Sequence, residues 1–131
     1  MASSSFKANL KFGGNTYPII ASSFGFSQAI DKQGRPSSGV HSGGINITIV
    51  AGADEKLLEW MVTSDKQDQG SIVWNKIDAE SSLKELKFED AYCVGFNESF
   101  AAETPDSMLL NISITARKIT VGNVAWEDTD W

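Results

Sequence analysis

The residues that could do chemistry are few and lie far apart in the chain. His41 is the single histidine and Cys93 the single cysteine among 131 residues. A Ser-His-Asp triad would have to use His41, but the sequence has no G-x-S-x-G turn, and an imidazole in a Gly/Ser-rich stretch is usually solvated. One histidine and one cysteine do not supply the three or four ligands of a zinc site. We therefore expect no catalytic residue and no metal site.

The other candidate groups favour structural roles. Cys93 stands between Tyr92 and Val94 in a strand pattern, where a packed thiol is expected. Adjacent acids such as Glu89 and Asp90 point to opposite faces of a strand and make a poor acid–base pair. The glycines of residues 34–44 match neither G-x-x-x-x-G-K-[ST] nor G-x-G-x-x-G, so we expect no phosphate cradle and no cofactor. These residues indicate a binding or structural protein.

Charge and composition limit the classes of partner that the chain can bind and the class of protein that it can be. With 11 basic and 17 acidic side chains the net charge is −6, and no stripe of Lys and Arg offers a surface for nucleic acid. The length and the 41% hydrophobic content predict one folded domain over residues 1–131. The opening MASSSFKANLKF has no apolar run of signal-peptide length, and no segment is long enough to span a membrane. A single cysteine permits no intramolecular disulfide and fits a reducing compartment.

Alternation with a period of two predicts that most of the chain is β-strand. The strands expected are residues 6–12, 16–30, 44–51, 71–78, 83–90, 91–100 and 107–121. Gly13-Gly14-Asn15 predicts a hairpin turn because glycine adopts positive φ readily, and Pro18 predicts an edge or a bulge. Along residues 107–121 the inward side chains are Leu110, Ile112, Ile114 and Ala116, and the opposite ones are Asn111, Ser113, Thr115 and Arg117.

One segment breaks this period. Over residues 54–65 apolar side chains recur at helical spacing, namely Leu57, Leu58, Trp60, Met61 and Val62, and Asp54 is placed to cap the helix. One short helix in an antiparallel β chain indicates a barrel or sandwich with a helix packed on its side or end.

Two features remain unexplained by a simple monomer. Some strands are apolar on both faces, with Val73 and Ile77 opposite Ile72 and Trp74, and Ile119 and Val121 opposite Leu110 and Ile112. Either an oligomerising barrel or a large barrel with a covering helix would bury both faces. The second feature is the polar stretch DKQGRPSSGVHSGG (31–44), which could be a linker, a lid, a phosphate cradle or a limb that grips another molecule.

Several stretches in order carry a family resemblance. They are GRPSSG (34–39), LLEWMV (57–62), GSIVW (70–74), ELKFEDAYCVGF (85–96) with ESF (98–100), and ITARKITVGN (114–123). Together with the opening SFKANLKFGGNTYPI, they resemble the Bacteroidota branch of the type VI secretion tube protein, haemolysin-coregulated protein or TssD. The resemblance runs from Phe6 to Asn123 and leaves the acidic tail, residues 124–131, without a role.

The resemblance implies a fold and a function. The fold is an antiparallel β-barrel of two packed sheets with one short flanking helix. The protein is not an enzyme: six copies form a ring, and rings stack into a hollow tube inside a contractile sheath. Sheath contraction expels the tube with its spike and effectors, so the protein is cytoplasmic when assembled and extracellular after firing. Its partners are itself, the sheath, the spike and effectors, with no nucleic acid and no membrane insertion.

The resemblance also implies roles for residues. The loop of residues 31–44 would be the arm that reaches the neighbouring ring, and this sequence has His41-Ser42 where relatives are expected to have an arginine. The residues expected to stack the rings are Gly34, Arg35, Pro36, Ser37, Ser38, Gly39, Val40 and His41. The polar face of Asn111, Ser113, Thr115 and Arg117 would line the lumen, or else lie on an outer surface.

Other functions stay open at this point. A monomeric barrel could bind a small apolar ligand with Trp60, Trp74 and Phe96. A hydrolase would use His41. A related contractile injection particle would use the same ring.

Overall fold

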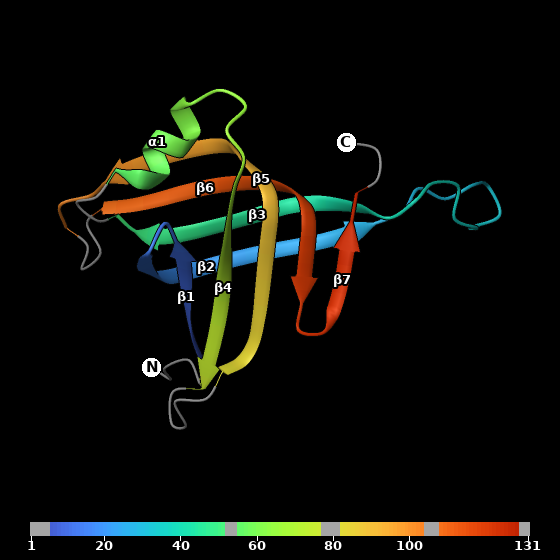
Figure 1. The fold of residues 1–131 in the computed structure, drawn as a ribbon, viewed down its shortest axis with the longest axis horizontal. Coiled ribbons are helices and arrows are strands. Elements are labelled where there is room, and N and C mark those ends of the chain that lie inside the picture. Colours follow the sequence, from blue (N-terminus) through green and yellow to red (C-terminus); the bar gives the residue numbers. More distant parts are fainter. Residues whose placement is uncertain (1–5, 52–54, 77–81, 104–107, 129–131) are drawn as a thin grey trace.

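The computed structural model describes residues 6–51, 55–76, 82–103 and 108–128 (Figure 1). They form seven strands and one helix. The elements are β1 (Phe6–Phe12), β2 (Asn15–Ser27), β3 (His41–Val50), α1 (Lys56–Val62), β4 (Asp68–Lys76), β5 (Ser82–Phe100), β6 (Met108–Val121) and β7 (Val124–Glu127). The one described helix has seven residues, too few to cross a bilayer.

The strands form one antiparallel sheet that closes on itself. Its order is β3-β2-β1-β4-β5-β6-β7, and an additional pairing of β3 with β6 closes six strands into a barrel. β6 changes partner along its length, because Leu109–Ile114 pair with β3 whereas Lys118–Val121 pair with β7. The predicted antiparallel barrel with one short helix is confirmed.

The first hairpin is the one expected. Gly13 and Gly14 have φ of +60° and +82°, and Phe12 pairs with Asn15 across them, which is the geometry that a two-residue hairpin turn requires. The side chain of Lys56, at the start of α1, donates a hydrogen bond to the Gly13 carbonyl. Pro18 lies beside the bulge of β2 at Ile19/Ala21, as predicted.

Alternating apolar residues of β1, β3 and β6 form the core. The inward residues predicted for β6, Leu110, Ile112, Ile114 and Ala116, are buried, and so are Leu10, Phe12, Ile45, Ile47 and Ile49. Trp60 of α1 is 1% exposed and stacks on Phe12, with ring centroids 4.7 Å apart, and on Phe88, at 6.2 Å. This aromatic stack fixes the helix to the barrel.

The helix is shorter than predicted. It covers Lys56–Val62 rather than residues 54–65, its N-cap is Glu55 without a side-chain hydrogen bond, and Asp54 lies outside the described residues. Leu58 and Val62 are exposed, because a single short helix on a barrel can bury only one narrow stripe.

A change of face explains why β6 is apolar on both sides. Asp90 of β5 has φ +50°. Before Asp90 the buried residues of β5 are the even-numbered Leu86 and Phe88, and after it they are the odd-numbered Ala91 and Cys93. The side of the strand that faces the core therefore changes at Asp90. The paired strand β6 changes sides at the same level, so Ile119 and Ile112 both reach the core. On β4 Ile72 and Val73 are both buried, and Ile77 lies outside the described residues.

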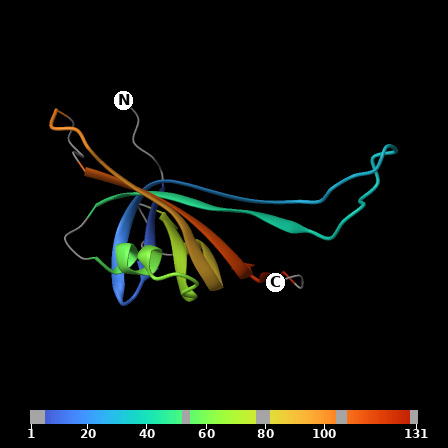
Figure 2. The same cartoon turned by 90° about the horizontal axis from the view of Figure 1, so that it is seen from above.

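The β2–β3 hairpin extends far beyond the barrel (Figures 1 and 2). β2 ends at Ser27 rather than at residue 30, and β3 begins at His41 rather than at residue 44. Ser42, Gly43 and Gly44 are thus strand residues. Pairing with β2 overrides their weak strand propensity, and Gly44, with φ +93°, lies opposite the Phe24/Phe26 irregularity of β2. The loop is residues 28–40, which we call the arm.

Candidate assembly surface

The tip of the arm is a folded turn. The Asp31 carboxylate accepts hydrogen bonds from the backbone N–H groups of Gln33 and Arg35, each at 2.9 Å. The Gly34 N–H donates to the Asp31 carbonyl at 3.0 Å, and its φ of +81° suits glycine. The polar residues therefore stabilise a local turn, in which the Asp31 carboxylate accepts hydrogen bonds from the backbone that follows it.

The rest of the arm is held across its width. The Ser37 N–H donates to the Ala29 carbonyl at 2.7 Å, and the Ala29 N–H donates to Ser38 Oγ at 2.9 Å. Ile30 and Pro36 form an isolated bridge between these contacts. The arm is thus a narrow continuation of the hairpin.

The structure places the predicted arm residues along this hairpin. Gly34 and Arg35 are at the tip, Pro36, Ser37, Ser38, Gly39 and Val40 form the returning limb, and His41 is the first residue of β3, opposite Ser27. The Arg35 side chain is 75% exposed and lies 3.9 Å from Asp31, so this ion pair holds it weakly. Its guanidinium is available to a partner.

Aromatic side chains support the base of the arm. Phe24 contacts Trp74 with ring centroids 6.2 Å apart, and Phe26 contacts Trp126 of β7 at 5.4 Å. The Trp126 indole N–H donates to the Val40 carbonyl at 3.1 Å. Sequence reasoning left Trp126 without a role, and its only signal was a tryptophan in an otherwise acidic tail.

A polar surface runs across β2, β3, β6 and β5, which we call the polar wall. Two cross-strand rows make it up, one of Ser23, Asn46, Ser113 and Gly95 and one of Ala21, Thr48, Asn111 and Asn97. None of these residues is charged, and the intervening Ile47 and Ile112 are buried on the other face.

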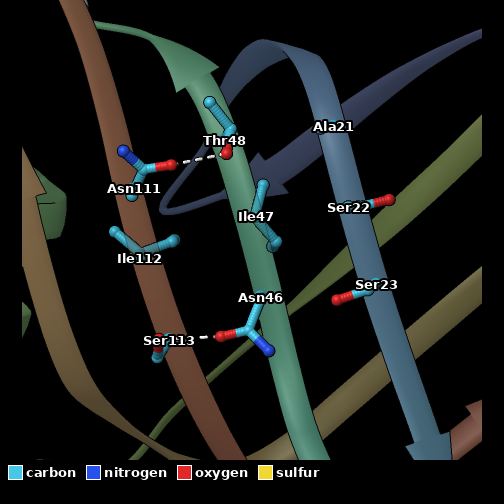
Figure 3. A pocket seen from close by; sticks show the side chains of 9 residues that line it. All are labelled: Ala21, Ser22, Ser23, Asn46, Ile47, Thr48, Asn111, Ile112 and Ser113. Carbon is cyan, nitrogen blue, oxygen red and sulfur yellow. Dashed lines mark hydrogen bonds between the residues drawn. The ribbon is translucent and has the colours of Figure 1, made fainter.

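Hydrogen bonds within the polar wall join neighbouring strands (Figure 3). Thr48 Oγ1 donates to Asn111 Oδ1 at 2.6 Å, and Ser113 Oγ donates to Asn46 Oδ1 at 2.8 Å. A shallow groove of about 280 Å³ lies over these rows. A Cβ at Gly95 would lie 3.2 Å from Ser113 Cβ, so the absent side chain makes room for this row.

The predicted polar face divides in two. Asn111 and Ser113 belong to the polar wall, and Thr115 follows them beside Tyr92. Arg117 lies further along β6, where its guanidinium is 3.5 Å from Glu127 of β7. The structure therefore brings Asn111 and Ser113 together with β3, and Arg117 together with β7.

The polar wall has two open edges. Among the described residues β2 from Ala21 onward pairs only with β3, and β5 from Val94 onward pairs only with β6. The outer backbone groups of these segments can pair with strands of another chain. One four-stranded wall therefore offers complementary edges on its two sides.

The remaining candidates from the sequence are Cys93, the possible metal ligands and the tryptophans. Cys93 is buried, and burial raises the pKa of its thiol. Within the described ranges no three His, Cys, Asp or Glu side chains gather as a metal site would require. Trp60 is enclosed by Phe12 and Phe88, whereas Trp74 contacts Phe24. These two tryptophans thus have separate aromatic partners.

Comparisons with known proteins were made by family and by structure. The family model described as TssD, hemolysin coregulated protein Hcp, matches residues 4–131 and so includes the tail. Hcp1 from Flavobacterium johnsoniae, one of the Bacteroidota, is 31% identical with a TM-score of 0.87, covering 93% of this chain and 99% of that chain. A comparison with curated proteins gave no match.

More distant solved structures share the fold. Hcp1 from Salmonella typhimurium is 11% identical with a TM-score of 0.76, and the match covers 95% of each chain. The secreted protein Hcp3 from Pseudomonas aeruginosa is 17% identical with a TM-score of 0.61, covering 94% of this chain and 97% of that one.

Proposed function

The chain belongs to the haemolysin-coregulated protein (TssD) family of type VI secretion tube proteins, and on this basis we propose that six copies form a ring and that rings stack into the secretion tube. The family is structural, and the proposal needs no catalytic residue. The open-edged polar wall is the observation that carries the proposal.

The open edges of β2 and β5 support the formation of a closed ring. If the β2 edge of one copy pairs with the β5 edge of the next, the walls of successive copies join into one continuous sheet. Such a contact uses different surfaces on the two partners, and it closes into a ring when the rotation per copy is an exact fraction of a turn. Backbone pairing would satisfy the open edges that a monomer leaves to water.

The polar wall is suited to line the lumen. Its outward residues are small and uncharged, and all but Ala21 and Gly95 are polar; Thr48 and Ser113 already donate to neighbouring strands. A surface of this kind holds neither apolar nor strongly charged cargo firmly, because it offers little area for hydrophobic contact and no ion pair. Effectors could then be carried and released.

The arm is suited to join rings. It projects from one end of the wall (Figure 2), and Arg35 at its tip is exposed. Charge-assisted hydrogen bonds from a guanidinium are among the stronger polar contacts across an interface. The assembled tube would lie in the cytoplasm inside its sheath, carry a spike, and reach the outside when the sheath contracts.

Secretion tests this function. In a bacterium that carries the whole apparatus, the chain should be found in the culture medium when the sheath is intact and be lost from it when the sheath gene is deleted. A cytoplasmic enzyme measured in the same medium controls for lysis. Equal amounts of the chain in both media would remove the proposal.

A further inference from the structure

The two ends of the molecule differ in charge. The arm carries Lys32 and Arg35 against one acidic residue, Asp31, although the whole chain has a net charge of −6. The end of β5 and the start of β6 lie at the opposite end of the long axis (Figures 1 and 2). In the sequence, residues 98–108, from the end of β5 to the start of β6, contain three acidic residues and no basic one. We call Glu98, Phe100, Glu103 and Met108 the acidic end.

Both ends also expose apolar side chains. On the arm Ile30 is 66% exposed, and at the acidic end Phe100 is 67% and Met108 is 40% exposed. Phe100 and Met108 are cross-strand partners, so they form one apolar pair, and Glu98 lies two residues from Phe100 on the same strand face. Adjacent exposed apolar residues beside charges are typical of an interaction surface.

The fold places these ends on one sheet. β3 begins beside the arm at His41 and ends at Val50, which pairs with Leu109 of β6, next to Met108. A second copy that follows in the same direction therefore brings its arm to the acidic end of the first. A contact of this head-to-tail kind repeats without closing, which produces a stack.

Electrostatics selects the same arrangement. Two arms meeting tip to tip would bring basic residues together, and two acidic ends would bring Glu98 and Glu103 of both copies together. Like-charge contacts disfavour wrong orientations, whereas opposite charges steer association and fix the register. Only the head-to-tail arrangement pairs opposite charges.

We propose that the acidic end receives the arm tip of a second copy in the next ring, with Lys32 and Arg35 facing Glu98 and Glu103 and with Ile30 against Phe100 and Met108. This inference rests on the proposed ring and adds the surface to which the arm binds.

Cysteine capture tests the contact. In the variant Lys32→Cys/Glu103→Cys, oxidation at high protein concentration should link chain to chain into a ladder of dimers, trimers and longer species on a non-reducing gel. A disulfide within one chain is excluded, because position 32 belongs to the arm and position 103 follows the end of β5, and these segments lie at opposite ends of the molecule (Figures 1 and 2). The matched control is Lys32→Cys/Lys11→Cys, in which the second cysteine is on the exposed face of β1. The wild-type chain controls for the buried Cys93.

The outcomes separate the two proposals. We expect a ladder at least several-fold stronger in the test pair than in the control pair, and weaker when oxidation is done in about 1 M NaCl, since salt at that concentration screens charges beyond ~3 Å. Rings without a ladder, or equal ladders in both pairs, would overturn the acidic end as receiver and leave the ring standing. A chain that gives no ring-sized species on a size-exclusion column would overturn the proposed function itself.

Discussion

Trp126 donates its indole N–H to the carbonyl of Val40 across 3.1 Å and so ties β7 to the base of the arm. The two residues are 86 positions apart in the sequence. The same indole packs on Phe26, on the other limb of the hairpin. The C-terminal strand thus holds both limbs of the arm at the point where it leaves the barrel.

Removing this contact should loosen the base of the arm without unfolding the barrel. For Trp126→Ala we expect amide hydrogen exchange in residues 24–28 and 40–44 to become about tenfold faster, because one hydrogen bond and one aromatic contact together contribute roughly 1–2 kcal/mol. Trp126→Phe keeps an aromatic ring but loses the indole N–H, so its exchange rates should lie between those of the wild type and those of Trp126→Ala. Val124→Ala, at an exposed position of β7, is the control. Unchanged exchange in Trp126→Ala would show that β7 does not hold the arm.

Substitutions in the aromatic stack of Phe12, Trp60 and Phe88 should lower stability more than substitutions at exposed positions of the same helix. Trp60→Ala should lower the free energy of unfolding by about 3–5 kcal/mol, since it empties the space between Phe12 and Phe88. Trp60→Phe should cost less, although it loses the indole hydrogen bond to the Lys66 carbonyl at 2.9 Å. Leu58→Ala, at an exposed position of the same helix, should change little. Denaturant unfolding measures all three, and a Trp60→Ala loss below about 1 kcal/mol would contradict the packing.

Burial of Cys93 predicts a pH dependence. Its thiol pKa lies above the ordinary value of 9.0 in the folded chain because burial disfavours the thiolate. Below that value both states keep the proton; as the pH rises past it, the unfolded chain loses the proton first and stability falls. The wild type should therefore lose more stability than Cys93→Ala between about pH 8 and about pH 10. Parallel curves for the two proteins would show that the thiol does not contribute.

A change at the arm tip should affect ring stacking without affecting the ring itself. Arg35→Glu should leave the ring intact but weaken stacking and secretion, because it reverses the charge of the exposed guanidinium. Lys84→Glu makes the same charge change on the barrel and should behave as the wild type. Electron microscopy of stack length and the amount of secreted chain measure the effect. Unchanged tubes and secretion in Arg35→Glu would remove the arm from the stacking contact.

The faces of the strands could be predicted because burial imposes a strict period of two. Ile45, Ile47 and Ile49 alternate with polar residues and are buried, and the hairpin at Gly13-Gly14 follows from the positive φ that such turns require. These are local signals. The identity of the arm and its residues came from family resemblance instead.

The features that the sequence did not reveal depend on contacts between distant residues. The face switch at Asp90 is a backbone rotation; the sequence showed its result, apolar residues on both faces of residues 107–121, but not its position or cause. Trp126 acts on Val40 only because β6 turns away from β3 and carries β7 to the arm. The joining of Asn111 to Thr48, 63 residues away, likewise depends on barrel closure.

The mass of the protein in solution tests the central claim most directly. Light scattering on a size-exclusion column, with negative-stain images of the same fractions, should give a species of six 14.2 kDa chains with ring-shaped views. Short stacks of such rings would support the arm as well. A monomer that persists at the highest attainable concentration, with no rings in the images, would contradict the account.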